Sequence, residues 1–208
     1  MRALIIGAGG GVGSAVVRAL NAAPDAYALT LVGRDARKLG ALGGQAVPTD
    51  VASELEVQAL FDDLPPQDLI VYAAGDIQPQ PLKTTPADAW NRVLDANLTG
   101  LFYTLKYADA KLNPGARVFV LGARPELVTF RGFGAYAAAK AGVAALVAVA
   151  AQEYKRKASL TLVLPRAVNT DFWRNVGKPP KDALEPRAVA EAIMQSLAGE
   201  PVDELRVG

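Results

Sequence analysis

The chain has 208 residues, a length that predicts a single domain with a large core. With 22 basic and 21 acidic residues its net charge is +1, so it offers no field of one sign to nucleic acid or to a membrane surface. It contains no Cys and no His, which excludes disulfides, thiol nucleophiles, Ser-His-Asp hydrolysis and most transition-metal sites, and leaves acid–base chemistry to Tyr, Lys, Asp or Glu.

Short aliphatic or β-branched runs alternate along the chain with longer helical patterns. This alternation, with strands that are apolar on both faces, predicts a parallel sheet covered by helices on both sides. The strands are expected at residues 3–6, 28–32, 45–47, 69–73, 117–121, 160–164 and 205–207. The helices are expected near residues 12–22, 35–42, 53–62, 87–111, 135–156 and 187–198.

Four helix boundaries have physical markers. The first helix should end before Pro24, because proline cannot continue the hydrogen-bond ladder. Ser53 is a good cap for the third helix, and the Asn-Pro-Gly sequence at 113–115 should stop the fourth. Pro186 is a favoured first-turn residue and marks the start of the last helix.

A glycine-rich turn, Gly7-Ala-Gly-Gly-Gly-Val-Gly13, separates the first strand from the first helix. Glycines there allow the backbone to approach a ligand closely, and the helix N-terminus offers free N–H groups to a pyrophosphate. The turn satisfies Gly-x-x-x-Gly-x-Gly but not Gly-x-Gly-x-x-Gly, and no Lys-Ser/Thr pair follows it, so it is not a P-loop. We interpret it as a dinucleotide site rather than a tight turn with spare glycines. The candidate contacts are Gly7, Gly9, Gly10, Gly11, Val12 and Gly13.

The tip of the second strand indicates which dinucleotide binds. An acidic residue there accepts hydrogen bonds from the ribose diol and favours NAD, whereas a basic residue pairs with a 2′-phosphate and favours NADP. Arg34 follows Gly33 at this tip, and Lys38 is close behind. The sequence therefore favours NADP over NAD, although the neighbouring Asp35 could reverse the preference and Arg34 could simply be solvated.

A Tyr-x-x-x-Lys motif places Tyr136 and Lys140 one turn apart on one helix face. A nearby ammonium lowers the pKa of a Tyr, so that the phenol can exchange a proton with a bound alcohol or carbonyl. Tyr107 and Lys111 repeat the spacing, but at the end of the helix before the fifth strand, where Lys111 would serve the helix C-terminus. The helix of Tyr136 instead starts at the carboxyl edge of the sheet, where open α/β sheets bind ligands. Position therefore favours Tyr136 and Lys140 as the catalytic pair.

The glycine register at residues 7–13 and the run Ala135-Tyr136-Ala-Ala-Ala-Lys140 resemble the short-chain dehydrogenase/reductase family, and the resemblance covers nearly the whole chain. It implies a Rossmann-type doubly wound parallel sheet of about seven strands in the order 3-2-1-4-5-6-7, in one three-layer α/β/α domain over residues 1–208. It also implies hydride transfer between NADP(H) and a carbonyl or alcohol substrate, with Tyr136 as the acid/base and Lys140 as its assistant.

The same resemblance implies further contacts with the cofactor. Segments that match the family's adenine-binding, Asn-Ala-Gly and Pro-Gly-x-Val-x-Thr motifs contain Asp50, Val51, Ala73, Ala74, Gly75, Pro165, Val168 and Thr170. Of these, Val168 and Thr170 are expected to contact the nicotinamide carboxamide. Asn97 lies in a match to Asn-Leu-x-Gly and is the candidate for the family's structural and proton-relay Asn.

The pattern breaks at the end of the fifth strand, where Ala123 occupies the position of the family's catalytic Ser. Alanine has no hydroxyl to hold the substrate oxygen, and losing one such donor typically costs about 10²- to 10³-fold in rate. Three outcomes stay open. Tyr136 can act as the main donor, Thr129 or a backbone N–H can substitute, or the protein can bind the cofactor without turnover, as a sensor or structural partner.

The substrate and the assembly are less closely defined. Phe130, Phe133, Phe172 and Trp173 are candidates for an apolar substrate pocket, or are ordinary core and rim residues. The helix after Tyr136 is apolar on nearly every side, so a partner subunit is expected to cover one face, giving a homodimer or homotetramer.

No signal peptide is recognised and no apolar run reaches about 18 residues, so we expect a soluble, cytoplasmic protein that binds neither membrane nor nucleic acid nor metal.

Overall fold

The computed structural model describes residues 1–208 and contains one seven-stranded parallel sheet. The strands are β1 (Arg2–Ile6), β2 (Ala28–Gly33), β3 (Gln45–Pro48), β4 (Gln67–Tyr72), β5 (Leu112–Leu121), β6 (Ala158–Pro165) and β7 (Glu204–Val207). They lie in the order β3-β2-β1-β4-β5-β6-β7, which confirms the predicted Rossmann-type topology.

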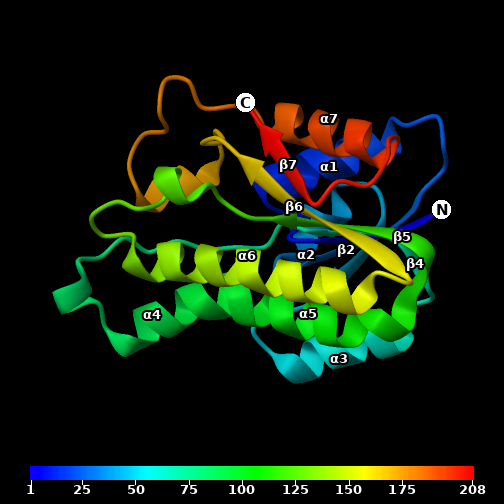
Figure 1. The fold of residues 1–208 in the computed structure, drawn as a ribbon, viewed down its shortest axis with the longest axis horizontal. Coiled ribbons are helices and arrows are strands. Elements are labelled where there is room, and N and C mark those ends of the chain that lie inside the picture. The colour runs from blue at the N-terminus through cyan, green and yellow to red at the C-terminus, as the bar shows by residue number, and fades with distance from the viewer.

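Helices cover both faces of the sheet and complete the three layers (Figure 1). They are α1 (Gly11–Asn21), α2 (Ala36–Gly40), α3 (Glu54–Asp63), α4 (Ala87–Leu94), α5 (Gly100–Ala108), α6 (Gly134–Tyr154) and α7 (Pro186–Leu197). Helices α1 and α7 lie on one face, and α3, α5 and α6 lie on the other. The apolar strands serve both layers because successive side chains alternate: in β1, Leu4 and Ile6 join one core while Ala3 and Ile5 join the other.

The sequence markers of the helix boundaries are confirmed at three of the four positions. Helix α1 ends at Asn21, three residues before Pro24, and Pro186 is the first residue of α7. The Ser53 hydroxyl accepts a hydrogen bond of 3.4 Å from the backbone N–H of Glu56 at the start of α3.

The predicted helix over 87–111 is wrong in one respect, because a π-helical turn over Asp95–Thr99 separates α4 from α5. Within it the Asn97 side-chain amide donates to the carbonyl of Val93, in competition with the regular backbone pattern. The carbonyl of Ala96 instead accepts a hydrogen bond of 3.2 Å from the hydroxyl of Tyr72 on β4. The turn therefore anchors the helix to the sheet.

The fifth strand begins earlier than the predicted start at 117. Strand β5 begins at Leu112, directly after the helical turn that ends at Lys111, and pairs there with Gln67 of β4. The Asn-Pro-Gly sequence, expected to stop the helix, therefore lies inside the strand. The register shifts between Gln67 and Leu69, and Gly115 has a φ of +83°, a conformation that glycine adopts without strain.

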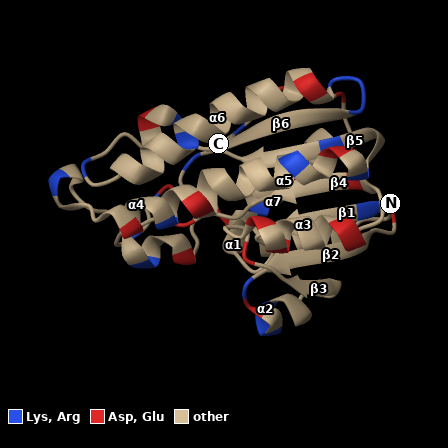
Figure 2. Cartoon of the chain, turned by 90° about the horizontal axis from the view of Figure 1, so that it is seen from below, with Lys and Arg blue, Asp and Glu red and all other residues tan.

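Helix α6 has the length and composition of a membrane span, which corrects the expectation that no apolar segment is that long. Its 18-residue window has a mean hydropathy of 1.6, and Figure 2 shows it almost without charge. In the fold, however, Val143, Val147 and Ala150 of α6 are buried in the core against β6. A helix that packs on a sheet in this way can have the length and composition of a membrane span.

Gly100 allows α5 to approach β4, and its replacement tests this packing. A Cβ at Gly100 would lie 2.7 Å from the Tyr72 hydroxyl and 2.9 Å from Val51. Gly100→Ala is therefore expected to destabilise the protein by about 1–3 kcal/mol in urea unfolding. Gly40 in α2 has open space around its Cβ position, so the control Gly40→Ala should stabilise by about 0.5–1 kcal/mol. Equal effects of the two substitutions would contradict the close approach.

Candidate active site

Two adjoining hollows of ≈ 620 Å³ and ≈ 680 Å³ follow the carboxyl ends of the strands. They share walls formed by Gly10 and by residues 73–76, so together they make one cleft. The first hollow contains Tyr136, and the second contains Arg34. Every candidate catalytic or cofactor-binding residue from the sequence lines one of the two hollows except Gly13.

The glycine turn owes its shape to close backbone contacts. Gly7 has a φ of +81°, and a Cβ there would lie 2.5 Å from the backbone nitrogen of Ala74 at the end of β4. A Cβ at Gly13 would collide with the backbone of Gly7. Gly13 therefore lets α1 start against the turn, and it packs behind the cleft rather than lining it as the sequence suggested.

The N-terminus of α1 faces the shared wall of the cleft. The helix begins at Gly11 with no side-chain cap and no acidic residue in its first turn. Its first N–H groups are therefore left without a partner inside the helix. Gly10, Gly11 and Val12 all line the cleft, so this end of α1 can receive the negative charge of a phosphate.

At the far end of the second hollow, Asp35 is the N-cap residue of α2. Its carboxylate caps α2 by accepting from the backbone N–H groups of Arg37 (3.0 Å) and Lys38 (3.2 Å), which lowers the pKa of Asp35. Arg34 and Lys38 line the hollow, and the side chain of neither forms an ion pair. Two unpaired cations therefore border this end of the cleft.

Tyr136 stands in the first hollow on the first turn of α6, with a hydroxyl that forms no hydrogen bond within the protein. Burial raises the pKa of Tyr136. The expected lowering of this pKa by the ammonium is therefore wrong for the protein without ligand. The reason is geometric: Lys140 Nζ lies 5.6 Å from the centre of the Tyr136 ring and is turned to a different acceptor.

Lys140 is the most unusual charged residue of the cleft because it is 6% exposed and has no acidic partner. Its Nζ donates a hydrogen bond of 2.9 Å to the backbone carbonyl of Leu121 at the end of β5. Burial lowers the pKa of Lys140 to about 8. Near neutral pH the ammonium is therefore charged but easily discharged, which suits a group that works beside an acid or base.

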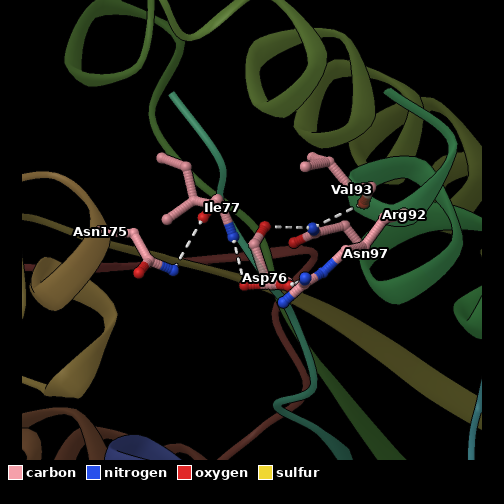
Figure 3. A network of polar contacts seen from close by, with 6 residues as sticks. All are labelled: Asp76, Ile77, Arg92, Val93, Asn97 and Asn175. Atoms are coloured by element: carbon pink, nitrogen blue, oxygen red, sulfur yellow. Dashed lines mark hydrogen bonds and ion pairs between the residues drawn. The ribbon is translucent and has the colours of Figure 1, made fainter. Parts of the chain in front are cut away.

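Asn97 joins the π-helical turn to the loop after β4, as Figure 3 shows. Its side-chain amide donates to the carbonyls of Asp76 (2.7 Å) and Val93 (2.8 Å), while its Oδ1 is buried without a partner. A Cβ at Gly75 would lie 2.7 Å from that Oδ1 and 3.9 Å from Lys140 Nζ. The unpartnered oxygen and the buried ammonium therefore both lie close to Gly75 in the same cleft.

Thr129 supplies no hydroxyl to the part of the cleft that Ala123 lines. Ala123 lines the first hollow together with Tyr136, as the sequence predicts. Thr129 is exposed, lies outside both hollows, and its hydroxyl donates to the carbonyl of Pro125 at 2.7 Å. The idea that Thr129 substitutes for the missing hydroxyl is therefore not supported.

The second Tyr-x-x-x-Lys copy lies away from the cleft, as predicted. The Tyr107 hydroxyl is 3.0 Å from the carboxylate of Glu54 on α3. Lys111 donates to the carbonyls of Asp62 and Leu64 at the end of α3, and not to its own helix as the sequence suggested. This copy therefore ties α5 and the 3₁₀ turn Asp109–Lys111 that follows it to α3.

The structure adds residues that the sequence did not single out. Asp76 lines both hollows and accepts from Arg92 (2.8 Å) and from the backbone N–H of Ile77 (2.9 Å). Across the cleft, Asn175 donates to the carbonyl of Ile77 at 3.3 Å. Asp76 follows the candidate segment 73–75 directly, and that adjacency was the only signal for it in the sequence.

Comparison with known proteins places this geometry in context. A family model described as enoyl-(acyl carrier protein) reductase matches residues 7–204. A curated relative, an uncharacterized oxidoreductase of Staphylococcus aureus (strain MRSA252), is 26% identical over 216 residues, which cover 94% of this chain and 90% of that protein.

Two solved structures resemble the whole chain. A short-chain oxidoreductase from Thermus thermophilus is 38% identical, with a TM-score of 0.88 over 97% of this chain and 98% of that one. An alcohol dehydrogenase from the archaeon Thermococcus sibiricus, complexed with 5-hydroxy-NADP, is 25% identical, with a TM-score of 0.85 over 99% of this chain and 94% of that one.

The burial of Lys140 gives a prediction about stability. Because the pKa of Lys140 falls from 10.5 to about 8 on folding, the charged form opposes folding by about 3 kcal/mol below pH 8. Lys140→Met removes this cost but leaves the Leu121 carbonyl without its donor, so a net stabilisation of about 1–2 kcal/mol is expected at pH 7. In thermal unfolding, the extra stability of Lys140→Met over wild type should shrink between pH 8 and pH 10. In that range the folded wild type has lost the Lys140 proton and no longer buries a charge.

The exposed Lys178 forms no ion pair, so Lys178→Met is the matched control and should change stability little at any pH. A Lys140→Met protein less stable than wild type at pH 7 would contradict the predicted cost of the buried charge.

Proposed function

Since this chain belongs to the short-chain dehydrogenase/reductase family, we propose that it transfers hydride between NADP(H) and a carbonyl or alcohol substrate, with Tyr136 as the acid/base and Lys140 as its assistant. The observation that carries the proposal is the free Tyr136 hydroxyl in the cleft, one helical turn from the buried Lys140.

The residues of the cleft fit a dinucleotide. The uncapped start of α1 can hold the pyrophosphate, and the glycine turn brings the backbone close enough to contact it. Asp50 and Val51 border the second hollow, where an adenine would lie, and Val168 and Thr170 border the first, where a carboxamide would lie. When bound, the nicotinamide supplies or accepts the hydride.

In the reductive direction, Tyr136 donates its phenolic proton to the carbonyl oxygen of the substrate as the carbonyl carbon is reduced. The ammonium of Lys140, whose Nζ lies 5.6 Å from the centre of the Tyr136 ring, would stabilise the charge that remains on the phenolate. The unpartnered Oδ1 of Asn97, near Gly75 and Lys140, supports a role for Asn97 in holding a proton path to that ammonium. In the oxidative direction Tyr136 takes the proton back from the alcohol.

Three observations favour NADP over NAD. Arg34 and Lys38 are unpaired at the end of the cleft where the adenosine ribose would lie. Asp35, the carboxylate beside Arg34 in the same hollow, uses its Oδ1 to cap α2, which leaves only Oδ2 for a ribose diol. The related Thermococcus sibiricus enzyme was solved with a modified NADP. A 2′-phosphate would supply the charge that the two cations lack.

A second candidate function is a protein that binds NADP(H) with little or no turnover. It is favoured by the methyl group of Ala123 in the cleft and by the place of Thr129 outside both hollows. Without a second side-chain donor, the substrate oxygen is held by Tyr136 alone, which lowers the expected rate about 10²- to 10³-fold.

Assembly as a homodimer or homotetramer is also proposed. Phe102 on α5 is 47% exposed and Val149 on α6 is 54% exposed, on two neighbouring helices of one layer. A partner subunit that covers these helices would bury both side chains. The cytoplasmic location stays a prediction.

Removal of one cation tests the choice of dinucleotide. Arg34→Ala should weaken the binding of NADPH about 10- to 100-fold, because one charge-assisted contact is lost, and should leave the binding of NADH unchanged. Isothermal titration with each dinucleotide measures both affinities. Arg37→Ala is the matched control, since Arg37 is exposed on the adjoining helix but outside the cleft. An equal loss for NADPH and NADH would contradict recognition of the 2′-phosphate.

Turnover distinguishes the two candidate functions. The enzyme is expected to oxidise NADPH with at least one member of a panel of aldehydes, ketones, quinones and an enoyl thioester, and Tyr136→Phe should abolish this activity. Ala123→Ser should raise the rate if the missing hydroxyl limits it. Tight binding of NADPH with no turnover by either the wild type or Ala123→Ser would favour the second candidate.

A further inference from the structure

Five aromatic side chains line the first hollow in a continuous row with Tyr136 at its centre. The ring centres are 6.0 Å apart for Phe130 and Phe133, 6.4 Å for Phe133 and Tyr136, 5.3 Å for Tyr136 and Phe172, and 6.0 Å for Phe172 and Trp173. Two separate segments supply the two sides of the row: the start of α6 with the loop before it, and the 3₁₀ turn Asp171–Asn175.

The 3₁₀ turn is held in place by hydrogen bonds at three points. The Trp173 indole donates to the carbonyl of Val168 at 2.9 Å, and the backbone N–H of Phe172 donates to the Thr170 hydroxyl at 3.4 Å. Asn175 reaches the carbonyl of Ile77 on the loop after β4 (Figure 3). Phe172 and Trp173 therefore form a side of the cleft that exists before any ligand binds.

The position of Tyr136 in this row restricts the substrate. A carbonyl oxygen that accepts a hydrogen bond from the Tyr136 hydroxyl lies about 2.7–2.8 Å from it. The substituents on the carbonyl carbon then extend beside the rings of Phe133 and Phe172, which both contact Tyr136. Ala123 adds a methyl group to the same hollow. On the side of this row and of Ala123, the reacting carbon therefore faces apolar and aromatic groups.

Most charged groups of this hollow are already engaged. Arg124 donates to the carbonyls of Leu164, Val207 and Gly208 at the ends of β6 and β7. The ion pairs are Arg166 with Asp182, Asp171 with Arg174, and Asp76 with Arg92.

The rim of the hollow is apolar as well, since Phe130 is 58% exposed and Leu127 is 38% exposed. Exposed apolar side chains at the rim of a cleft indicate a surface that a ligand covers. A polar or charged substituent on the substrate would therefore meet few free partners in this hollow, whereas an apolar one would meet rings on both sides of Tyr136.

We infer that the substrate is an aromatic carbonyl compound, an aryl aldehyde or ketone, whose ring packs on Phe133 and Phe172 while its oxygen meets the Tyr136 hydroxyl. This inference rests on the proposed function. Aromatic rings favour edge-to-face or offset contacts with other rings, and one such pair adds about 2- to 10-fold in affinity over a saturated ring of the same size. Hydride from NADPH reduces the carbonyl carbon, and the Tyr136 proton completes the alcohol.

The direct test compares benzaldehyde with cyclohexanecarbaldehyde, which has the same number of carbons in a saturated ring. With NADPH as the reductant, kcat/KM for benzaldehyde should exceed that for cyclohexanecarbaldehyde at least about fivefold. Conjugation makes benzaldehyde the less electrophilic of the two, so intrinsic reactivity works against this result. Equal values, or a preference for the saturated ring, would overturn the inference while leaving the proposed hydride transfer intact.

Substitutions in the aromatic row show whether its rings cause the preference for benzaldehyde over cyclohexanecarbaldehyde. Phe172→Leu keeps an apolar side chain but removes one of the two rings, so the ratio of kcat/KM for benzaldehyde to kcat/KM for cyclohexanecarbaldehyde should fall about 2- to 10-fold. Phe130→Leu, at an exposed position that does not threaten folding, should reduce the preference in part. The matched control is Phe102→Leu on α5, which is 47% exposed and lies outside the cleft, and it should keep the full preference.

A binding measurement separates the failure of this inference from the failure of the proposed function. Isothermal titration of the NADPH-loaded protein with benzyl alcohol and cyclohexylmethanol requires no turnover. Tighter binding of benzyl alcohol, with a smaller difference between the two alcohols in Phe172→Leu, would support the aromatic site even in a protein that reduces nothing. Equal binding of the two alcohols in wild type and Phe172→Leu would overturn it.

Discussion

The hydrogen bond from the buried ammonium of Lys140 to the carbonyl of Leu121 joins α6 to the carboxyl end of β5. It fixes the second turn of α6 against the sheet, and through it the adjoining first turn that carries Tyr136. The ammonium is buried at the cleft without a counter-ion, at a cost in stability that an apolar residue would not have. Such a cost at a cleft residue is typical of a group retained for chemistry rather than for folding.

The other side of the cleft is held in place by the π-helical turn and by the glycine turn. The π-helical turn lets Asn97 reach the loop after β4, and Tyr72 and Gly100 hold that turn against the sheet. The glycine turn contacts the backbone at the end of β4, so its shape also depends on that strand end. The cleft is therefore built from strand ends that the parallel topology brings to one edge.

Much of the cleft could be predicted from local patterns. The glycine register, the position of Tyr136 and Lys140 and the tip of β2 all follow from strands and helices that the apolar runs define. The sequence left open whether Asp35 would reverse the preference for NADP and whether Thr129 would reach the cleft, and it did not reveal that burial raises the pKa of Tyr136. Each depends on which of several nearby partners a side chain meets. Lys111 is a further example, because its acceptors lie 47 and 49 residues away in the chain.

The sequence by itself determined the alternation of strands and helices, the turn between β1 and α1, and the residue types at the strand ends, because these depend on side-chain periodicity and on backbone freedom within a few residues. Only the tertiary structure decided the burial of Lys140, the π-helical turn at Asn97 and the aromatic row on both sides of Tyr136. These features arise where segments far apart in the chain meet, and desolvation, close approach and ring contacts exist only once those segments are packed together.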